Sequence, residues 1–442
     1  MKGRVCLYPL HFLTENKLID RSNCFVLKVM QAVIITNTES PELKQLTVLG
    51  SASLLPLGNE TILTKLIGLF LDSEISDIII VHNKAQTARL TSYVNAHYQF
   101  WPAFAKVNLH ELPDYCSLPE TLQRIRSSLS SEYLFITNSN TVICNINLRD
   151  IFLTMIRKKA SMVAVFSSLP ITESKLLKSL PSELTVTTSD GSVLITYVPA
   201  SDIKKQTKLS KSLTSQGSIL CRSDLRDCGF YLISRSTLDH ITKLGEDITH
   251  RKKSIWQYIW SEPPEINQET ELGSGDKTAI NGVNNYTECY KTGGTCIHEH
   301  NDEVIAVKIE DPLIYVETNR LIIQKSSSPG NQQQGKKGES GREPNLIQDN
   351  CMIHEKAFIR ATFVGSSCKI GANVRILNSV LLPNVEIKDN CTIQGCVIGE
   401  KAVIGDQSVL KSCAVAALQR VPTGTNLESK QLGFIDPELN TT

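Results

Sequence analysis

The chain has 442 residues, enough for two to four domains, and 46 Lys and Arg residues balance 45 Asp and Glu residues to a net charge of +1. Such a balance argues against direct nucleic-acid binding. The sequence contains no run of 18 apolar residues, so we expect no membrane-spanning helix. The thirteen cysteines include no Cys-x-x-Cys pair, which favours a reduced, cytosolic chain over a disulfide framework.

Residues 1–29 show no clear period, and we treat them as an N-terminal extension outside the fold. Between residues 30 and 261, short apolar segments alternate with helical stripes. Strands are expected at 31–36, 77–81, 133–137 and 162–166, and helices at 60–71, 84–97, 117–129 and 148–156. This order predicts a mostly parallel sheet with helices on both faces. Segments 184–188 and 193–198 flank Asp190-Gly191, a hairpin signal, so the sheet is expected to be mixed.

Two segments are poor in core residues. Residues 262–300 are predicted to be a disordered insertion and residues 326–345 a disordered linker, with a connecting strand and helix at 301–325. An alternative for the insertion is a zinc site, with Cys289, Cys296, His298 and His300 as the ligands. Their spacing matches no common zinc site, so we expect no metal there.

Residues 346–428 carry a repeat of large aliphatic side chains, and residues 429–442 follow as a tail. The steps between the aliphatics are six, six and five residues, as in Ile347, Ile353, Ile359 and Val364. A 17-residue coil with three sides predicts a left-handed β-helix, because a helix of period 3.6 cannot keep these positions aligned. Compact residues lie two positions before the aliphatics and include Cys351, Cys368, Cys391, Cys396 and Cys413.

Glycines follow several of these aliphatics, at Gly365, Gly371, Gly399 and Gly405. We expect them at tight corners that need relaxed backbone angles. Some hexapeptide-repeat proteins are acyltransferases that use a histidine between coils. The repeat contains only His354, which is expected to be a surface or corner residue.

An α/β domain followed by a left-handed β-helix resembles the sugar-nucleotide pyrophosphorylase superfamily and its descendants in translation. For an active enzyme, the resemblance implies a glycine-rich loop with an arginine, a lysine in a KPxxP segment, and an aspartate that holds Mg²⁺. This chain has Thr36, Asn37, Thr38 and Glu39 in the loop. Ala52 stands at the lysine position and Asn140 at the metal position, which predicts a fold that has lost nucleotidyl transfer.

A retained fold with a lost loop resembles the gamma and epsilon subunits of translation initiation factor 2B, the guanine-nucleotide exchange factor for initiation factor 2. Segments 54–59 (LLPLGN) and 227–234 (DCGFYLIS) fit either subunit. Segment 315–320 (YVETNR) and the last coils are more similar to gamma. The sequence ends at Thr442, where we expect no helical domain of the kind that carries the exchange activity of epsilon.

The resemblance to gamma implies a noncatalytic regulatory subunit without a cofactor. It would pair with an epsilon-like subunit and the other subunits of the complex to promote GDP release from initiation factor 2. Asn319 and Arg320, expected to be exposed, are candidate partner contacts. The alternatives are an active sugar-1-phosphate nucleotidyltransferase of the GDP-mannose pyrophosphorylase type and a truncated epsilon-like subunit.

Overall fold

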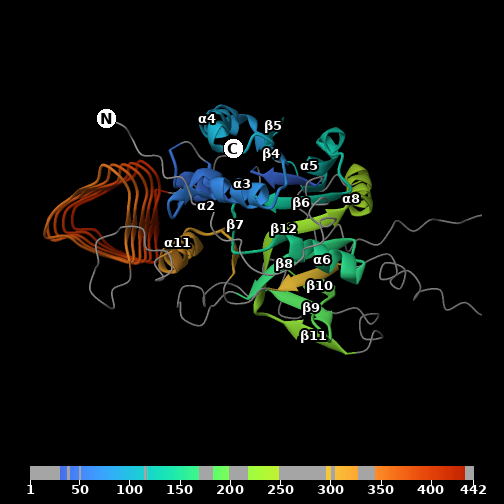
Figure 1. Cartoon of the computed structure of the whole chain (residues 1–442). Coiled ribbons are helices and arrows are strands. Elements are labelled where there is room, and N and C mark those ends of the chain that lie inside the picture. Colours follow the sequence, from blue (N-terminus) through green and yellow to red (C-terminus); the bar gives the residue numbers. More distant parts are fainter. Residues whose placement is uncertain are drawn as a thin grey trace, which may run out of the picture.

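The computed structural model describes residues 30–36, 40–48, 51–113, 116, 118–168, 183–198, 218–247, 295–299, 304–326 and 344–433. It consists of an α/β domain and a three-sided solenoid of short strands, which lies to one side of that domain (Figure 1). Within these residues, the helices are too short or too polar to cross a membrane.

The α/β domain is built on a seven-stranded sheet of order β13-β8-β12-β6-β1-β4-β5. The central strand β1 is parallel to β4 and β6, whereas β12 is antiparallel to both β6 and β8. The predicted mixed, mostly parallel sheet is therefore confirmed. The strands are β1 (Gln31–Ile35), β4 (Asp77–Asn83), β5 (Lys106–Leu112), β6 (Tyr133–Asn138), β8 (Met162–Ser168), β12 (Leu225–Ser234) and β13 (Thr295–Glu299).

Helices cover both faces of the sheet because strand side chains alternate between them. Ala32 and Ile34 of β1 join the core under α3 and α6, whereas Val33 and Ile35 join the core under α5 and α8. The helices are α2 (Pro41–Gln45), α3 (Ile62–Asp72), α4 (Thr87–His97), α5 (Leu118–Arg124), α6 (Leu148–Lys158) and α8 (Arg235–Asp247). Each predicted helix in this domain is present, with ends shifted by a few residues.

Three elements differ from the sequence-based expectation. The hairpin of β9 (Leu184–Thr188) and β10 (Leu194–Val198) joins β11 (Ile219–Arg222) in a separate antiparallel sheet, so the antiparallel strand of the main sheet is β12. Strand β13 pairs with β8 although residues 295–299 lie in the segment expected to be an insertion. Strand β5, which has no continuous apolar run, was not foreseen.

The connection to the solenoid consists of β14 (Ile305–Lys308), paired with β7 (Thr141–Cys144), and of helix α11 (Pro312–Ser326). Three parallel sheets then form the solenoid, with partners 17 residues apart such as Val364 and Leu381. The predicted coil length is confirmed. One sheet contains β15 (Leu346–Ile347), β18 (Phe363–Val364), β21 (Val380–Leu381), β24 (Val397–Ile398), β27 (Ala414–Val415) and β30 (Gln431–Leu432).

The other two sheets of the solenoid have five strands each. The second contains β16 (Met352–Ile353), β19 (Lys369–Ile370), β22 (Glu386–Ile387), β25 (Val403–Ile404) and β28 (Arg420–Val421). The third contains β17 (Phe358–Arg360), β20 (Arg375–Leu377), β23 (Thr392–Gln394), β26 (Val409–Lys411) and β29 (Asn426–Glu428).

The coil glycines have a different role from the expected one. Gly365, Gly371, Gly399 and Gly405 do not have positive φ; a Cβ at Gly399 would lie 2.5 Å from the backbone nitrogen of Ala417 in the next coil. They allow neighbouring coils to approach closely. The left-handed corner positions recur every 17 residues instead, as in the column of Asn350, Ser367, Asn384, Lys401 and Leu418.

The first sheet of the solenoid packs on the α/β domain and α11 (Figure 1). Its outward residues Phe363, Val380, Val397 and Ala414 are buried in the core of that domain. The backbone N–H of Glu400 donates to the carbonyl of Leu46 at 2.9 Å. Outward positions on the other two sheets instead include exposed charged residues such as Lys369 and Arg375.

Candidate functional site

Thr36 directly follows β1, where the resemblance places a phosphate-binding loop. It is fully buried, its N–H donates to the carbonyl of Val81 at 2.9 Å, and its hydroxyl lies 2.7 Å from Oε1 of Gln86. The polar groups of Thr36 therefore serve the sheet and the segment before α4. The other three loop residues, Asn37, Thr38 and Glu39, lie outside the described residues.

Ala52, where the resemblance places a lysine, is also buried. It begins a short 3₁₀ turn (Ala52–Leu54) and belongs to the main core of the α/β domain. Its carbonyl accepts a hydrogen bond from the N–H of Leu55 at 3.0 Å. Position 52 is thus a packing position with a neutral side chain.

Asn140, where the resemblance places a metal-binding aspartate, joins two segments that are distant in sequence. Its side-chain Nδ2 donates to the backbone carbonyl of Ile309 at 2.6 Å, and its backbone carbonyl accepts the N–H of Ile309 at 2.9 Å. Its Oδ1 is buried without a hydrogen-bond partner among the described residues. This neutral amide holds the chain between β14 and α11 against the end of β6.

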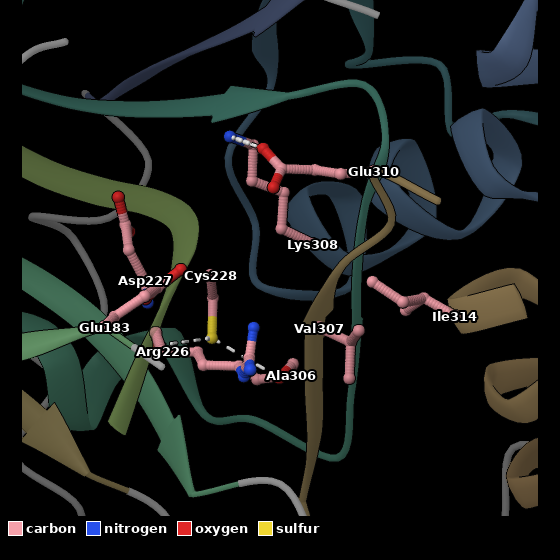
Figure 2. Close-up of a pocket in the computed structure, with 9 residues that line it drawn as sticks. All are labelled: Glu183, Arg226, Asp227, Cys228, Ala306, Val307, Lys308, Glu310 and Ile314. Atoms are coloured by element: carbon pink, nitrogen blue, oxygen red, sulfur yellow. Dashed lines mark hydrogen bonds and ion pairs between the residues drawn. The ribbon is translucent and has the colours of Figure 1, made fainter. Parts of the chain in front are cut away.

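A small pocket lies between β12 and β14 (Figure 2). Sequence analysis did not identify it, although part of its wall comes from the DCGFYLIS segment. Charged side chains from three separate segments meet here, which no local sequence pattern reveals. The lining residues are Glu183, Arg226, Asp227, Cys228, Ala306, Val307, Lys308, Glu310 and Ile314.

Lys308 provides a cation within this pocket. Its Nζ lies 2.5 Å from Oε1 of Glu310. Burial alone would lower the pKa of Lys308, but the carboxylates of Glu310, Asp227 and Glu183 outweigh it, and the pKa is raised. The lysine is therefore charged at neutral pH.

Asp227 organises the other side of the pocket. Its Oδ1 accepts the N–H of Gly229 at 2.9 Å and its Oδ2 accepts the hydroxyl of Tyr231 at 2.5 Å. Its own N–H donates to Oε2 of Glu183 at 3.2 Å, and burial raises the pKa of Glu183. The pocket thus combines carboxylates that already have partners in the protein.

Gly229 lets the walls of this pocket approach closely. Its φ is +67°, and a Cβ there would lie 2.8 Å from Nδ2 of Asn138 and 3.3 Å from Cδ of Lys308. Both the backbone angle and the contact require glycine. The DCGFYLIS segment is therefore part of β12 and also part of the pocket wall.

The residues at this edge of the sheet do not fit a Mg²⁺ ion. Magnesium prefers carboxylate oxygens in near-octahedral geometry, whereas Asn140 is neutral and the ammonium of Lys308 carries a positive charge. Among the described residues, no group of three or more His, Cys, Asp or Glu side chains is arranged to hold a metal. Of the zinc alternative, Cys289 and His300 lie outside those residues.

Asn319 and Arg320 are not exposed as expected. Asn319 is 1% exposed, and its Oδ1 accepts the N–H of Gly58 at 3.2 Å. Nε of Arg320 lies 3.1 Å from Oε1 of Glu317, which is itself buried on α11. The helix face that carries these residues packs against the fold because α11 lies between the α/β domain and the solenoid. His354, by contrast, is exposed at a corner, as predicted.

A scan against family models matched one family, described as the EIF2B subunit epsilon LbH domain, over residues 334–427. LbH denotes the left-handed β-helix, so the match agrees with the solenoid of parallel strands. No curated protein matched the chain. The family match covers roughly a fifth of the sequence, and the similarity that it shows is that of the solenoid to this domain of an eIF2B subunit.

Proposed function

We propose that this chain is a noncatalytic regulatory subunit of the initiation factor 2B complex, most similar to gamma. It pairs with an epsilon-like subunit and promotes GDP release from initiation factor 2 in the cytosol. The observation that carries the proposal is the family match to the solenoid, next to an α/β domain whose expected reactive positions hold Thr36, Ala52 and Asn140.

The contacts of these residues support the noncatalytic part of the proposal. Thr36 and Asn140 direct hydrogen bonds to other parts of the fold, and Ala52 packs in the core. Losing one preorganised donor in an active site costs about 10²–10³ in rate. The changes at these three positions therefore favour a retained scaffold without nucleotidyl transfer.

Two measurements on the full chain test the proposal. Co-expression with an epsilon-type subunit should give a stable complex that releases GDP from initiation factor 2 faster than the epsilon-type subunit alone. The chain by itself should release no pyrophosphate from GTP and a sugar 1-phosphate. Pyrophosphate release above background would instead establish the nucleotidyltransferase alternative, and failure to form the complex would reject the regulatory role.

A second candidate, an epsilon-like subunit, is favoured by the description of the matching family, which names epsilon. The similarity of segment 315–320 to gamma is the opposing observation. A complementation experiment separates the two: cells depleted of gamma should be rescued by this chain, and cells depleted of epsilon should not. The reverse pattern of rescue would support the epsilon-like subunit.

A further inference from the structure

The solenoid supplies backbone donors to the C-terminal end of α2. The N–H of Ala417 donates to the carbonyl of Gln45 at 2.8 Å, and the N–H of Glu400 donates to the carbonyl of Leu46 at 2.9 Å. The last carbonyls of a helix have no partner within the helix and need donors from elsewhere. For these two carbonyls the donors come from the other domain, which lies beside α2 in Figure 1.

The two donors occupy the same corner position in neighbouring coils, because Glu400 and Ala417 are one coil length apart. The preceding coil has Pro383 at this position, and proline has no N–H to donate. The corner itself accommodates either residue type. A Cβ at Gly365 would lie 2.7 Å from the nitrogen of Pro383, and a Cβ at Gly399 would lie 2.5 Å from that of Ala417. The backbone arrangement is therefore the same with and without a donor.

The side chain of Glu400 adds a third hydrogen bond to the same segment. Its Oε2 accepts the N–H of Val48 at 3.0 Å. Hydrogen bonds to an ionised carboxylate are roughly twice as strong as those between neutral groups. Glu400 thus binds the backbone on both sides of Thr47, whose hydroxyl accepts the N–H of Ser51 at 3.1 Å.

Helix α2 is too short to be stable by itself. It has five residues, whereas isolated helices shorter than about 12–15 residues are marginal in water. At its start, Oγ of Ser40 accepts the N–H of Leu43 at 3.3 Å. Leu43 and Leu46 are fully buried. The helical form of α2 therefore depends on packing and on the bonds that the solenoid provides at its other end.

We propose that the docked solenoid holds α2 in its helical form through Glu400 and Ala417, and that displacement of the solenoid releases α2. The contact is a conformational device that couples the position of one domain to the order of a short segment in the other. A partner that moves the solenoid changes α2 in this way. Ser40 directly follows the segment where the resemblance places a phosphate-binding loop. The device involves contacts within one chain and does not depend on the proposed function.

Hydrogen exchange of the full chain, followed by mass spectrometry, tests the proposal. Glu400→Ala removes the acceptor of the Val48 N–H, so the amides of residues 43–48 should exchange at least about tenfold faster, while those of β1 and β6 keep their rates. Glu400→Gln retains a side-chain oxygen that can accept this N–H, and its rates should fall between those of wild type and Glu400→Ala. The control is Glu428→Ala, which removes an exposed carboxylate from the third sheet and should leave residues 43–48 unchanged.

A second variant removes a donor instead of an acceptor. Ala417→Pro deletes the N–H that binds Gln45, at a corner position that already holds Pro383 in another coil, and should accelerate exchange of the same amides. Unchanged exchange of residues 43–48 in either Glu400→Ala or Ala417→Pro overturns the proposal. So does an equal acceleration in β1, β6 and the solenoid strands, because the variants would then unfold the whole chain and not release α2 alone.

Discussion

Asn319 accepts a hydrogen bond from the backbone N–H of Gly58 at 3.2 Å, across 261 residues of sequence. The contact joins two of the segments that carry the resemblance, residues 54–59 and residues 315–320. Tyr315 reinforces it, since its hydroxyl donates to the carbonyl of Pro56 at 2.5 Å. These motif residues therefore anchor α11, which lies between the α/β domain and the solenoid.

Asn319→Ala should destabilise the α/β domain by about 1–3 kcal/mol, because it leaves the buried N–H of Gly58 without its acceptor. Urea unfolding followed by tryptophan fluorescence measures the change. Asn426→Ala, on the exposed side of β29, is the control and should have little effect. Equal effects of the two substitutions would contradict the anchoring role of Asn319.

The stack of aliphatics inside the solenoid predicts a difference between its middle and its end. Ile376→Ala should lower the free energy of unfolding by about 2–5 kcal/mol, because Ile376 is fully buried inside the stacked coils. Ile347→Ala should cost clearly less, since Ile347 in the first coil is 45% exposed. Circular dichroism during chemical unfolding compares the two variants, and equal losses would argue against a continuous stacked core.

Two glycine-to-alanine substitutions should change the free energy of unfolding in opposite directions. Gly399→Ala is expected to destabilise by about 1–3 kcal/mol because its Cβ would lie 2.5 Å from the backbone nitrogen of Ala417. Gly68→Ala should stabilise by about 0.5–1 kcal/mol, since it lies within α3 and its Cβ would meet nothing within 4 Å. Thermal unfolding midpoints provide the test. A stabilised Gly399→Ala variant would show that neighbouring coils are not in close contact there.

Lys308 should stabilise the fold in a pH-dependent manner. Its folded pKa is raised above the ordinary value of 10.5, so its stabilisation is complete below that value and is lost as pH rises through the folded pKa. The difference in unfolding midpoint between wild type and Lys308→Met should stay constant near neutral pH and shrink in this alkaline range. Lys411→Met, at an exposed position, is the control for the removal of a lysine side chain. A difference in unfolding midpoint that grows with pH would contradict a raised pKa for Lys308.

Cysteine reactivity should follow burial. Burial raises the pKa of the Cys228 thiol well above its usual range, whereas Cys221 on β11 is exposed. Iodoacetamide should therefore modify Cys221 before Cys228 in the native protein, as mass spectrometry of the peptides can show. In urea both should react at similar rates. Early modification of Cys228 in the native state would contradict the closed packing of β12 against β14.

The candidate site was predictable from sequence only in part. The resemblance predicts that Asn140 replaces a metal-binding aspartate, and its neutral side chain is evident from the sequence. Its bond to Ile309 could not be foreseen, because the partner lies 169 residues away. The expected exposure of Asn319 and Arg320 was wrong for a similar reason: a helix with apolar and polar residues on all sides is buried when two domains enclose it.

The amino-acid sequence alone determined the coil length of the solenoid and the alternation of buried strands and helices, since both depend on periods that short-range geometry imposes. Only the tertiary structure decided which solenoid face docks on the α/β domain, that Lys308 and Glu310 meet Asp227 and Glu183 in one pocket, and that β5 forms an edge. These features depend on contacts between segments far apart in the chain. Burial and partner choice arise there from packing, which local patterns do not encode.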